Sequence, residues 1–505
     1  MEMLRLLQLD FVHLSGSYEY LSGRLVWLSW KGFSLTCIPS TIIMDNLVAI
    51  DLSHSKLKQV WRGTKVMCKL KYLNLSHSIF LIRTPDFTGL NSLEKLLLSG
   101  CTKLVDVNQS IGCLNSLVVL DLNNCENLEK IPLSIFMLKS LIDVNLSGCS
   151  KLQWPTYFQR SSLESSILSL QFSSRIRKLA MEGCNITHVP IEIGSLMSLE
   201  FLNLGRNNFS NLPATIANLP TLKVLLVNMC SRLESIGALP VNLLGLSAHY
   251  CTSLQSVSME SKAAEAVFMA CFHCPKLVNN NFTYNFRRNI LHYAGLDEKR
   301  QYNIVVTGSE IPRWCNNQRD GNVVRFRVDR MIQGFILCVA FSGRYNQSTS
   351  RLSFIPDLFN ITEGDLSSLA GDMVGFDHPK CEDHPSFEDQ MWLSYVPNQT
   401  EGPDSTFFFD GEEVEITTRT WTSDLRVNKC GVSLVYEDDE KDTDTSAEDV
   451  PRVDENVLAV KPVRDSNILL NAGIFTGSVS FVGYLSHSRK AMQKKLESSP
   501  RENPN

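Results

Sequence analysis

Two short clusters of cysteine and histidine have spacings that suit metal coordination. Cys271 and Cys274 are separated by two residues, and His378, Cys381 and His384 follow one another at intervals of three. Thiolate and imidazole groups at such spacings are typical ligands of tetrahedral Zn²⁺. A structural zinc site normally needs a second pair of ligands, so we expect Cys271 and Cys274 to have another role. The second cluster is compatible with a metal site or with an exposed acidic loop.

The motifs of the common catalytic and nucleotide-binding sites do not occur in the sequence. There is no G-x-x-x-x-G-K-[S/T] phosphate loop, no G-x-S-x-G nucleophile motif and no H-E-x-x-H zinc-protease motif. No serine or cysteine stands in a recognisable activating context. We therefore expect neither enzyme activity nor a cofactor, and binding is the function that remains.

The composition is that of a soluble globular protein with more than one domain. Hydrophobic residues make up 44% of the 505 residues and charged residues 20%, with a net charge of −5. A chain of this length exceeds one ordinary domain. Because no basic field is present, we expect no nucleic-acid partner.

A leucine pattern repeats along the first half of the chain. The segment L-x-x-L-x-L, with apolar substitutes, begins at Leu4, Leu25, Leu47, Leu70, Leu93, Leu117, Leu141, Ile176, Leu199, Leu222 and Leu243. The intervals are 21 to 24 residues, except for one of 35 that contains a serine-rich insertion near residues 161–174. Leucine-rich repeats have periods of about 20–29 residues. Residues 1–260 are therefore predicted to form an α/β leucine-rich-repeat solenoid, a horseshoe with parallel strands on its concave face.

The ninth position of each repeat carries a small polar residue. These residues are Ser55, Ser78, Cys101, Cys125, Cys149, Cys184, Asn207, Cys230 and Cys251. In leucine-rich repeats this side chain bonds the turn backbone of an adjacent repeat. The cysteines should form a ladder of buried, reduced thiols, which favours a reducing compartment.

The outward positions of the predicted strands are the candidate binding surface. Side chains alternate along a strand, so the residues between the leucines face away from the core. We nominate Trp27, Asp51, Tyr72, Asn74, Lys95, Asp121, Asp143, Lys178, Phe201 and Asn203. Solenoids bind partners on this surface, and exposed aromatic residues suit interface anchors. Any single one of these side chains can also simply solvate the sheet.

The second half of the chain has a different residue pattern. Short apolar or alternating runs between residues 302 and 437 predict an antiparallel all-β sandwich. Residues 261–301 should be helical or irregular and cap the last repeat. Residues 438–505 begin with an acidic run and are predicted to be a disordered tail. Its apolar stretch, residues 468–485, contains several polar residues, so a membrane segment is not favoured.

Several motifs resemble the leucine-rich repeats of plant disease resistance proteins. Trp27-Leu-Ser-Trp30, Leu73-Asn-Leu-Ser76 and Thr84-Pro-Asp-Phe87 are similar to their early repeats, as are the Leu-Ser-Gly-Cys segments ending at Cys101 and Cys149. The subclass is the one with TIR, NB-ARC and leucine-rich-repeat domains, like the tobacco mosaic virus resistance protein. Ser309, Glu310, Ile311, Pro312 and Trp314 resemble the signature of its C-terminal jelly-roll/Ig-like domain.

The resemblance implies a recognition module of plant innate immunity. It covers roughly residues 1–440, and the phosphate loop of the NB-ARC domain is absent. The implied partner is a protein, either a pathogen effector or a guarded host protein, or a full-length receptor. No secretory signal is recognisable, so we expect the cytoplasm or nucleus. A non-immune interaction scaffold and a regulatory or decoy fragment are the alternatives.

Overall fold

The computed structural model describes most of the first 436 residues. The described ranges are 3–13, 21–153, 175–258, 267–279, 282–294, 302–344, 351–352, 354–360, 365–368, 376–377, 386–398, 410–420 and 425–436. The chain divides into two compact units, Met1–Thr445 and Ser446–Asn505. The second unit lies outside the described residues, as do the serine-rich insertion and the predicted tail.

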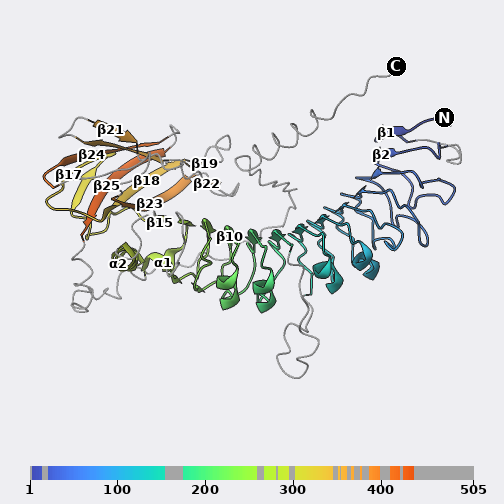
Figure 1. Ribbon diagram of the computed structural model, residues 1–505, viewed down its shortest axis with the longest axis horizontal. Coiled ribbons are helices and arrows are strands. Elements are labelled where there is room, and N and C mark those ends of the chain that lie inside the picture. Colours follow the sequence, from blue (N-terminus) through green and yellow to red (C-terminus); the bar gives the residue numbers. More distant parts are fainter. Residues whose placement is uncertain are drawn as a thin grey trace, which may run out of the picture. The chain divides into compact units, whose positions relative to one another are not determined.

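Parallel strands, one from each repeat, form one continuous sheet along the first unit (Figure 1). They are β1 (Leu6–Asp10), β2 (Trp27–Lys31), β3 (Ala49–Asp51), β4 (Tyr72–Asn74), β5 (Lys95–Leu97), β6 (Val119–Asp121), β7 (Asp143–Asn145), β8 (Lys178–Ala180), β9 (Phe201–Asn203), β10 (Val224–Leu226) and β12 (Gly245–Ser247). The middle residue of each three-residue strand is buried, as at Leu96 and Leu120. Because each repeat exposes its leucines on both sides, neighbouring repeats must cover them. The predicted leucine-rich-repeat solenoid is confirmed.

Short 3-10 helices carry several repeats back across the opposite side (Figure 1). They are η2 (Gln109–Cys113), η3 (Leu133–Met137), η5 (Ile191–Ser195) and η6 (Ala214–Asn218). A proline precedes three of them, at Pro132, Pro190 and Pro213. Its fixed φ starts the helical turn, and its missing N–H costs nothing at that position.

The residue directly before the ladder position adopts a left-handed conformation in every described repeat. The row is Phe11, Gly32, His54, His77, Gly100, Asn124, Gly148, Gly183, Arg206, Met229, Tyr250 and His273. This conformation ends each strand sharply, and glycine adopts it without steric cost. At Gly148 a Cβ would also lie 2.3 Å from Asn124 Oδ1, so a glycine is needed there for space as well.

The parallel sheet continues past residue 260, where the sequence analysis placed its end. Strand β14 (Val267–Cys271) lies parallel to β12, with Met269 opposite Leu246. It is followed by α1 (Pro275–Asn279) and α2 (Phe282–Ala294). The helices agree with the helical or irregular segment predicted over residues 261–301, whereas strand β14 was not predicted. Met269 and Cys271 replace the leucines in this unit, so the leucine count missed it.

The remaining strands form a two-layer β-sandwich joined to the solenoid through a shared strand. Strand β15 (Tyr302–Thr307) pairs parallel with β14 and antiparallel with β23 (Ser386–Pro397). Strands β18 (Gly334–Arg344), β25 (Leu425–Val435) and β16 (Asn317–Asp320) complete this front sheet. The back sheet contains β17 (Val323–Arg327), β24 (Glu413–Thr420), β20 (Phe354–Asn360) and β21 (Asp365–Ser368). The predicted all-β domain is confirmed (Figure 1).

Two short two-stranded sheets complete the β-structure of the described residues. Strands β11 (Ser235–Ile236) and β13 (Ser256–Val257) pair beside the last repeats. Strands β19 (Arg351–Leu352) and β22 (Phe376–Asp377) pair in the sandwich. Within the described part of the chain, no helix has the length and apolarity needed to cross a membrane.

Strand β14 divides its side chains between two cores. Met269 and Cys271 belong to the core of the solenoid, whereas Ala270 and Phe272 belong to the core between the two sheets of the sandwich. Ala270 lies opposite Ser247, on the outward face of the repeat strands. The core of the sandwich therefore begins on that outward face, and the two domains share one continuous sheet.

Candidate functional site

The outward face of the repeat strands, which we call the concave face, carries two parallel rows of side chains. The strand registers align Trp27, Ala49, Tyr72, Lys95, Val119, Asp143, Lys178, Phe201 and Val224 in the first row. They align Ser29, Asp51, Asn74, Leu97, Asp121, Asn145, Ala180, Asn203 and Leu226 in the second row. All ten residues nominated from the sequence stand in these rows.

An aromatic pair occupies the first row near its beginning. The rings of Trp27 and Tyr72 are nearly parallel, with an interplanar angle of 11° and centroids 6.5 Å apart. Ala49 stands between them in the sheet and is buried, whereas Trp27 remains 44% exposed. Large rigid rings that stay exposed in the folded chain are the kind of side chain that anchors protein interfaces.

The aspartate and asparagine residues of the second row hold the turns that follow their strands. In each case a side-chain oxygen accepts a hydrogen bond from the backbone N–H two residues later. The bonds are Ser53 N to Asp51, Ser76 N to Asn74, Asn123 N to Asp121, Ser147 N to Asn145 and Gly205 N to Asn203, at 3.0–3.1 Å. This local capping pattern is common for short polar side chains. Sequence reasoning nominated these residues for binding and missed their structural task.

Two carboxylates lie on adjacent strands in the middle of the concave face. Partial burial raises the pKa of Asp121, and the neighbouring charge of Asp143 raises it further. Burial also raises the pKa of Asp143, against the opposing effect of Lys178. Two like charges in a half-buried position are costly, and a partner cation would relieve that cost. On β5, the strand that precedes the strand of Asp121, the first row carries the exposed Lys95.

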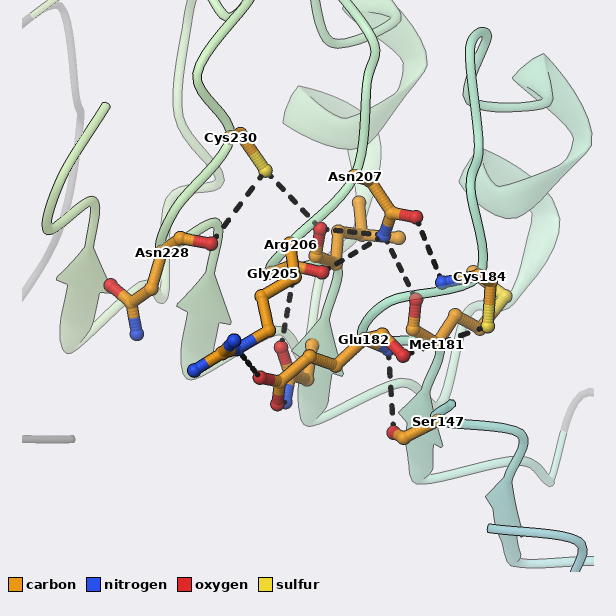
Figure 2. A network of polar contacts seen from close by, with 11 residues as sticks. Ser147, Met181, Glu182, Cys184, Gly205, Arg206, Asn207, Asn228 and Cys230 are labelled. Atoms are coloured by element: carbon orange, nitrogen blue, oxygen red, sulfur yellow. Dashed lines mark hydrogen bonds and ion pairs between the residues drawn. The ribbon is translucent and has the colours of Figure 1, made fainter. Parts of the chain in front are cut away.

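On strands β9 and β10 the concave face carries apolar side chains, and an ion pair lies beside β8 and β9. Phe201 lies beside Val224 in the first row. Glu182 Oε1 lies 3.0 Å from Arg206 Nε, and Glu182 Oε2 accepts a hydrogen bond of 3.1 Å from Asn203 Nδ2. Figure 2 shows Glu182 and Arg206 reaching toward each other across two neighbouring repeats. Glu182 thereby connects the repeat of β8 with the turn that follows β9.

The ladder beneath the concave face is confirmed in its position and its bonding. Each ladder thiol donates to a carbonyl of the preceding repeat, as Cys101 does to Leu75 and Cys230 to Leu204, at 3.3 and 3.4 Å. Burial raises the pKa of Cys101, Cys184 and Cys230 to about 12, so these thiols stay neutral. A neutral buried thiol is a poor nucleophile. The described cysteines are all free.

Asn207 replaces cysteine in one rung and makes more contacts than any thiol can (Figure 2). Its Oδ1 accepts hydrogen bonds from the backbone N–H groups of Cys184 and Ile186, at 3.1 and 3.0 Å. Its Nδ2 donates to the carbonyls of Met181, Leu204 and Gly205. Only the amide group can both donate and accept in this way.

The structure gives Cys271 and Cys274 structural roles. Cys274 Sγ donates to the carbonyl of Ala248 at 3.0 Å and so continues the ladder by one rung. Cys271 is buried in the solenoid core. The described residues contain no group of three potential metal ligands. His378, Cys381 and His384 lie outside the described residues.

Residues 309–314, which we call the signature segment, pack against the front sheet of the second domain. Ile311 is buried over Gly431, where a Cβ would lie 2.7 Å from the Ile311 side chain. Glu310 accepts a hydrogen bond of 2.7 Å from Lys429 at the surface. Trp314 packs against the solenoid-side core, whereas Ser309 is exposed and Pro312 is half-buried. The segment stabilises the domain, and contact with a partner stays a prediction.

Comparison with known proteins identifies the repeats. A family model described as "Disease resistance protein RPS4B-like, leucine-rich repeats" matches residues 66–276. This match covers most of the repeat region, which is similar to the leucine-rich repeats of that family. Disease resistance protein RPS4B of Arabidopsis thaliana is 26% identical over 84% of this chain, which corresponds to 41% of that protein. Disease resistance-like protein DSC1 is 26% identical over 85% of this chain and 47% of its own length, and RML1B is 32% identical over 62% and 30%; both are also from Arabidopsis thaliana.

The alignments cover only part of each relative. The chain spans less than half the length of the relatives it matches. A leucine-rich-repeat protein of Leptospira interrogans matches 48% of this chain and 75% of its own, at 20% identity and a TM-score of 0.23. The resemblance to disease resistance proteins stated from the sequence is confirmed. Repeats of this type are protein-interaction modules rather than catalytic domains.

Proposed function

We propose that this chain is a recognition module of plant intracellular innate immunity, which binds a pathogen effector or a guarded host protein. The contact surface comprises the concave face and the post-repeat domain. One observation carries the proposal. The first row of the concave face presents exposed, rigid and charged side chains that the fold itself does not need.

The contrast between the two rows supports this surface. Side chains of the second row cap turns, so their identity is restricted by the fold. Side chains of the first row make no such turn bonds, so Trp27, Tyr72 and Phe201 can be replaced without losing a backbone partner. Where a side chain makes no bond that the fold needs, the residue type can vary to suit a binding partner.

The shared sheet supports a role for both domains in one contact. Ala270 continues the second row, and its side chain lies in the core of the sandwich together with Phe272. The sandwich therefore stands on the concave side where the repeats end. A protein seated along the last repeats would meet this domain as well.

The site of action that fits is the cytoplasm or nucleus. A row of buried, unpaired thiols in the solenoid suits a reducing compartment. The relatives named as disease resistance proteins support a role in plant defence.

Affinity purification from infected and uninfected plant tissue tests the proposal. The bait is the whole chain, compared with a Tyr72→Ala/Phe201→Ala variant. The matched control is Ile191→Ala/Met197→Ala, which removes similar apolar area from exposed positions in or next to η5, outside the two rows. A protein enriched on infection, lost with the first variant and kept with the control, supports effector or guardee recognition. Equal recovery from all tissues and variants instead indicates a constitutive scaffold or a regulatory fragment.

A further inference from the structure

Two buried cysteines of the second domain contact each other. Cys315 Sγ lies 3.1 Å from Cys338 Sγ, and both side chains are buried. The ladder thiols instead donate to backbone carbonyls, as Cys251 does to Val227 and Cys274 to Ala248. Cys315 therefore has a sulfur as its hydrogen-bond partner where the ladder cysteines have an oxygen.

The two cysteines come from segments of different character. Cys338 lies in the middle of β18, which pairs with a neighbour on each side. Cys315 lies in the turn that follows Pro312, closed by a bond of 2.9 Å from Cys315 N to the carbonyl of Pro312. Gly431 allows this segment to approach the sheet, since a Cβ added there would lie 2.7 Å from Ile311 Cγ2. The contact therefore joins the signature segment to the centre of the front sheet.

We propose that Cys315 and Cys338 are a disulfide-forming site, which peroxide oxidises to lock the signature segment onto the front sheet. Cys315 is the side chain that meets the oxidant, because a turn opens more easily than a central strand. Its sulfur displaces water from hydrogen peroxide and becomes a sulfenic acid. The sulfur of Cys338 then attacks that sulfur and expels the hydroxyl group. The proton of the Cys338 thiol leaves with this hydroxyl as water, so two thiols and one peroxide give one disulfide and two waters.

The surroundings restrict the reaction to this pair. Cys338 is buried in a strand that is paired on both sides, so the oxidant does not reach it, and it reacts only with the Cys315 sulfur that already contacts it. Cys430 is also buried in this domain, but its side chain belongs to the sandwich core on the opposite face of the sheet. The Cys315–Cys338 bond is thus the only intramolecular disulfide expected among the described thiols of the second domain.

Peptide mapping of the oxidised chain tests the site directly. The full chain carries Cys68→Ser and Cys113→Ser, because these exposed thiols would otherwise link separate molecules. The protein is treated with hydrogen peroxide, its free thiols are alkylated in denaturant, and trypsin digestion is run without reductant. Trypsin separates Cys315, in residues 314–319, from Cys338, in residues 331–344. The expected product is one cross-linked pair of these two peptides, which dithiothreitol separates.

Controls in the same sample make the result decisive. Cys251 and Cys274 are neighbouring buried thiols of the ladder and should be recovered separately alkylated. The melting temperature should rise on oxidation in the parent protein and stay unchanged in Cys315→Ser. Recovery of Cys315 and Cys338 as separate alkylated peptides, while another thiol is oxidised, overturns the proposal. A cross-link that forms only after unfolding in urea overturns it equally.

Discussion

Replacing Asn207 with alanine is the sharpest test of how the ladder holds the repeats together. The side chain is 1% exposed and bonds five backbone groups in two repeats. The change removes the hydrogen-bond acceptor of two buried N–H groups, those of Cys184 and Ile186. An unsatisfied buried polar group costs about 1–3 kcal/mol, so two of them give a loss of roughly 2–6 kcal/mol.

The neighbouring residue provides the matched control. Asn208 is partly exposed, and its side chain donates to Asn185 Oδ1 at the surface. Asn208→Ala should change the free energy of unfolding by no more than about 0.5 kcal/mol. The two substitutions remove the same atoms one residue apart, so the difference between them measures the effect of burial and bonding.

Urea unfolding and hydrogen exchange measure the effect together. Repeat proteins can open locally, so exchange at individual amides reports the damaged rung. Asn207→Ala should lose protection at the amides of Cys184 and Ile186 and shift the urea midpoint downward. Equal midpoints for the two variants, with unchanged protection at both amides, would refute the reasoning.

Three further outcomes follow from the geometry. Gly148→Ala should lower the free energy of unfolding more than Gly183→Ala. Both positions are left-handed, so an alanine at either one costs about 1–2 kcal/mol of strain, but only at Gly148 would the added Cβ lie 2.3 Å from another atom. Equal losses of stability in urea would contradict this. Burial raises the folded-state pKa of Asp121 above its unfolded value, so the ionised form destabilises the fold. Asp121→Asn should therefore be more stable than the parent at pH 7, and this gain should fall to zero below the unfolded pKa, as measured by melting across pH. Ile311→Ala should cost about 2–5 kcal/mol, whereas Glu310→Ala at the surface should cost under about 0.5 kcal/mol, and similar losses in a melting assay would contradict the packing role.

The period of the leucines was enough to predict the solenoid. A leucine every 21 to 24 residues must be covered by its neighbours, and the ladder position follows from the same spacing. The leucine pattern does not continue into β14, where Met269 and Cys271 take the places of leucines. Packing needs an apolar side chain of suitable size and not leucine itself, so a pattern based on leucine ends one unit early.

The candidate surface was only partly predictable. Alternation placed the outward residues correctly in two rows, but it could not show which of them cap a turn. The signal existed in the sequence, since an aspartate or asparagine at the last position of a strand favours a bond to the N–H two residues later. The shared strand β15 left no comparable signal, because a strand that pairs with a solenoid on one side and a sandwich on the other reads as an ordinary apolar run.

Site-specific photocrosslinking in infected plant cells tests the central claim most directly. A photoreactive phenylalanine is placed at Tyr72 on the concave face or at Ile191 in η5, both of which lie at the surface of the solenoid. Binding through the concave face predicts an infection-dependent crosslinked protein at position 72 and none at position 191. Crosslinks at position 191 alone, or the same products at both positions without infection, would contradict the account.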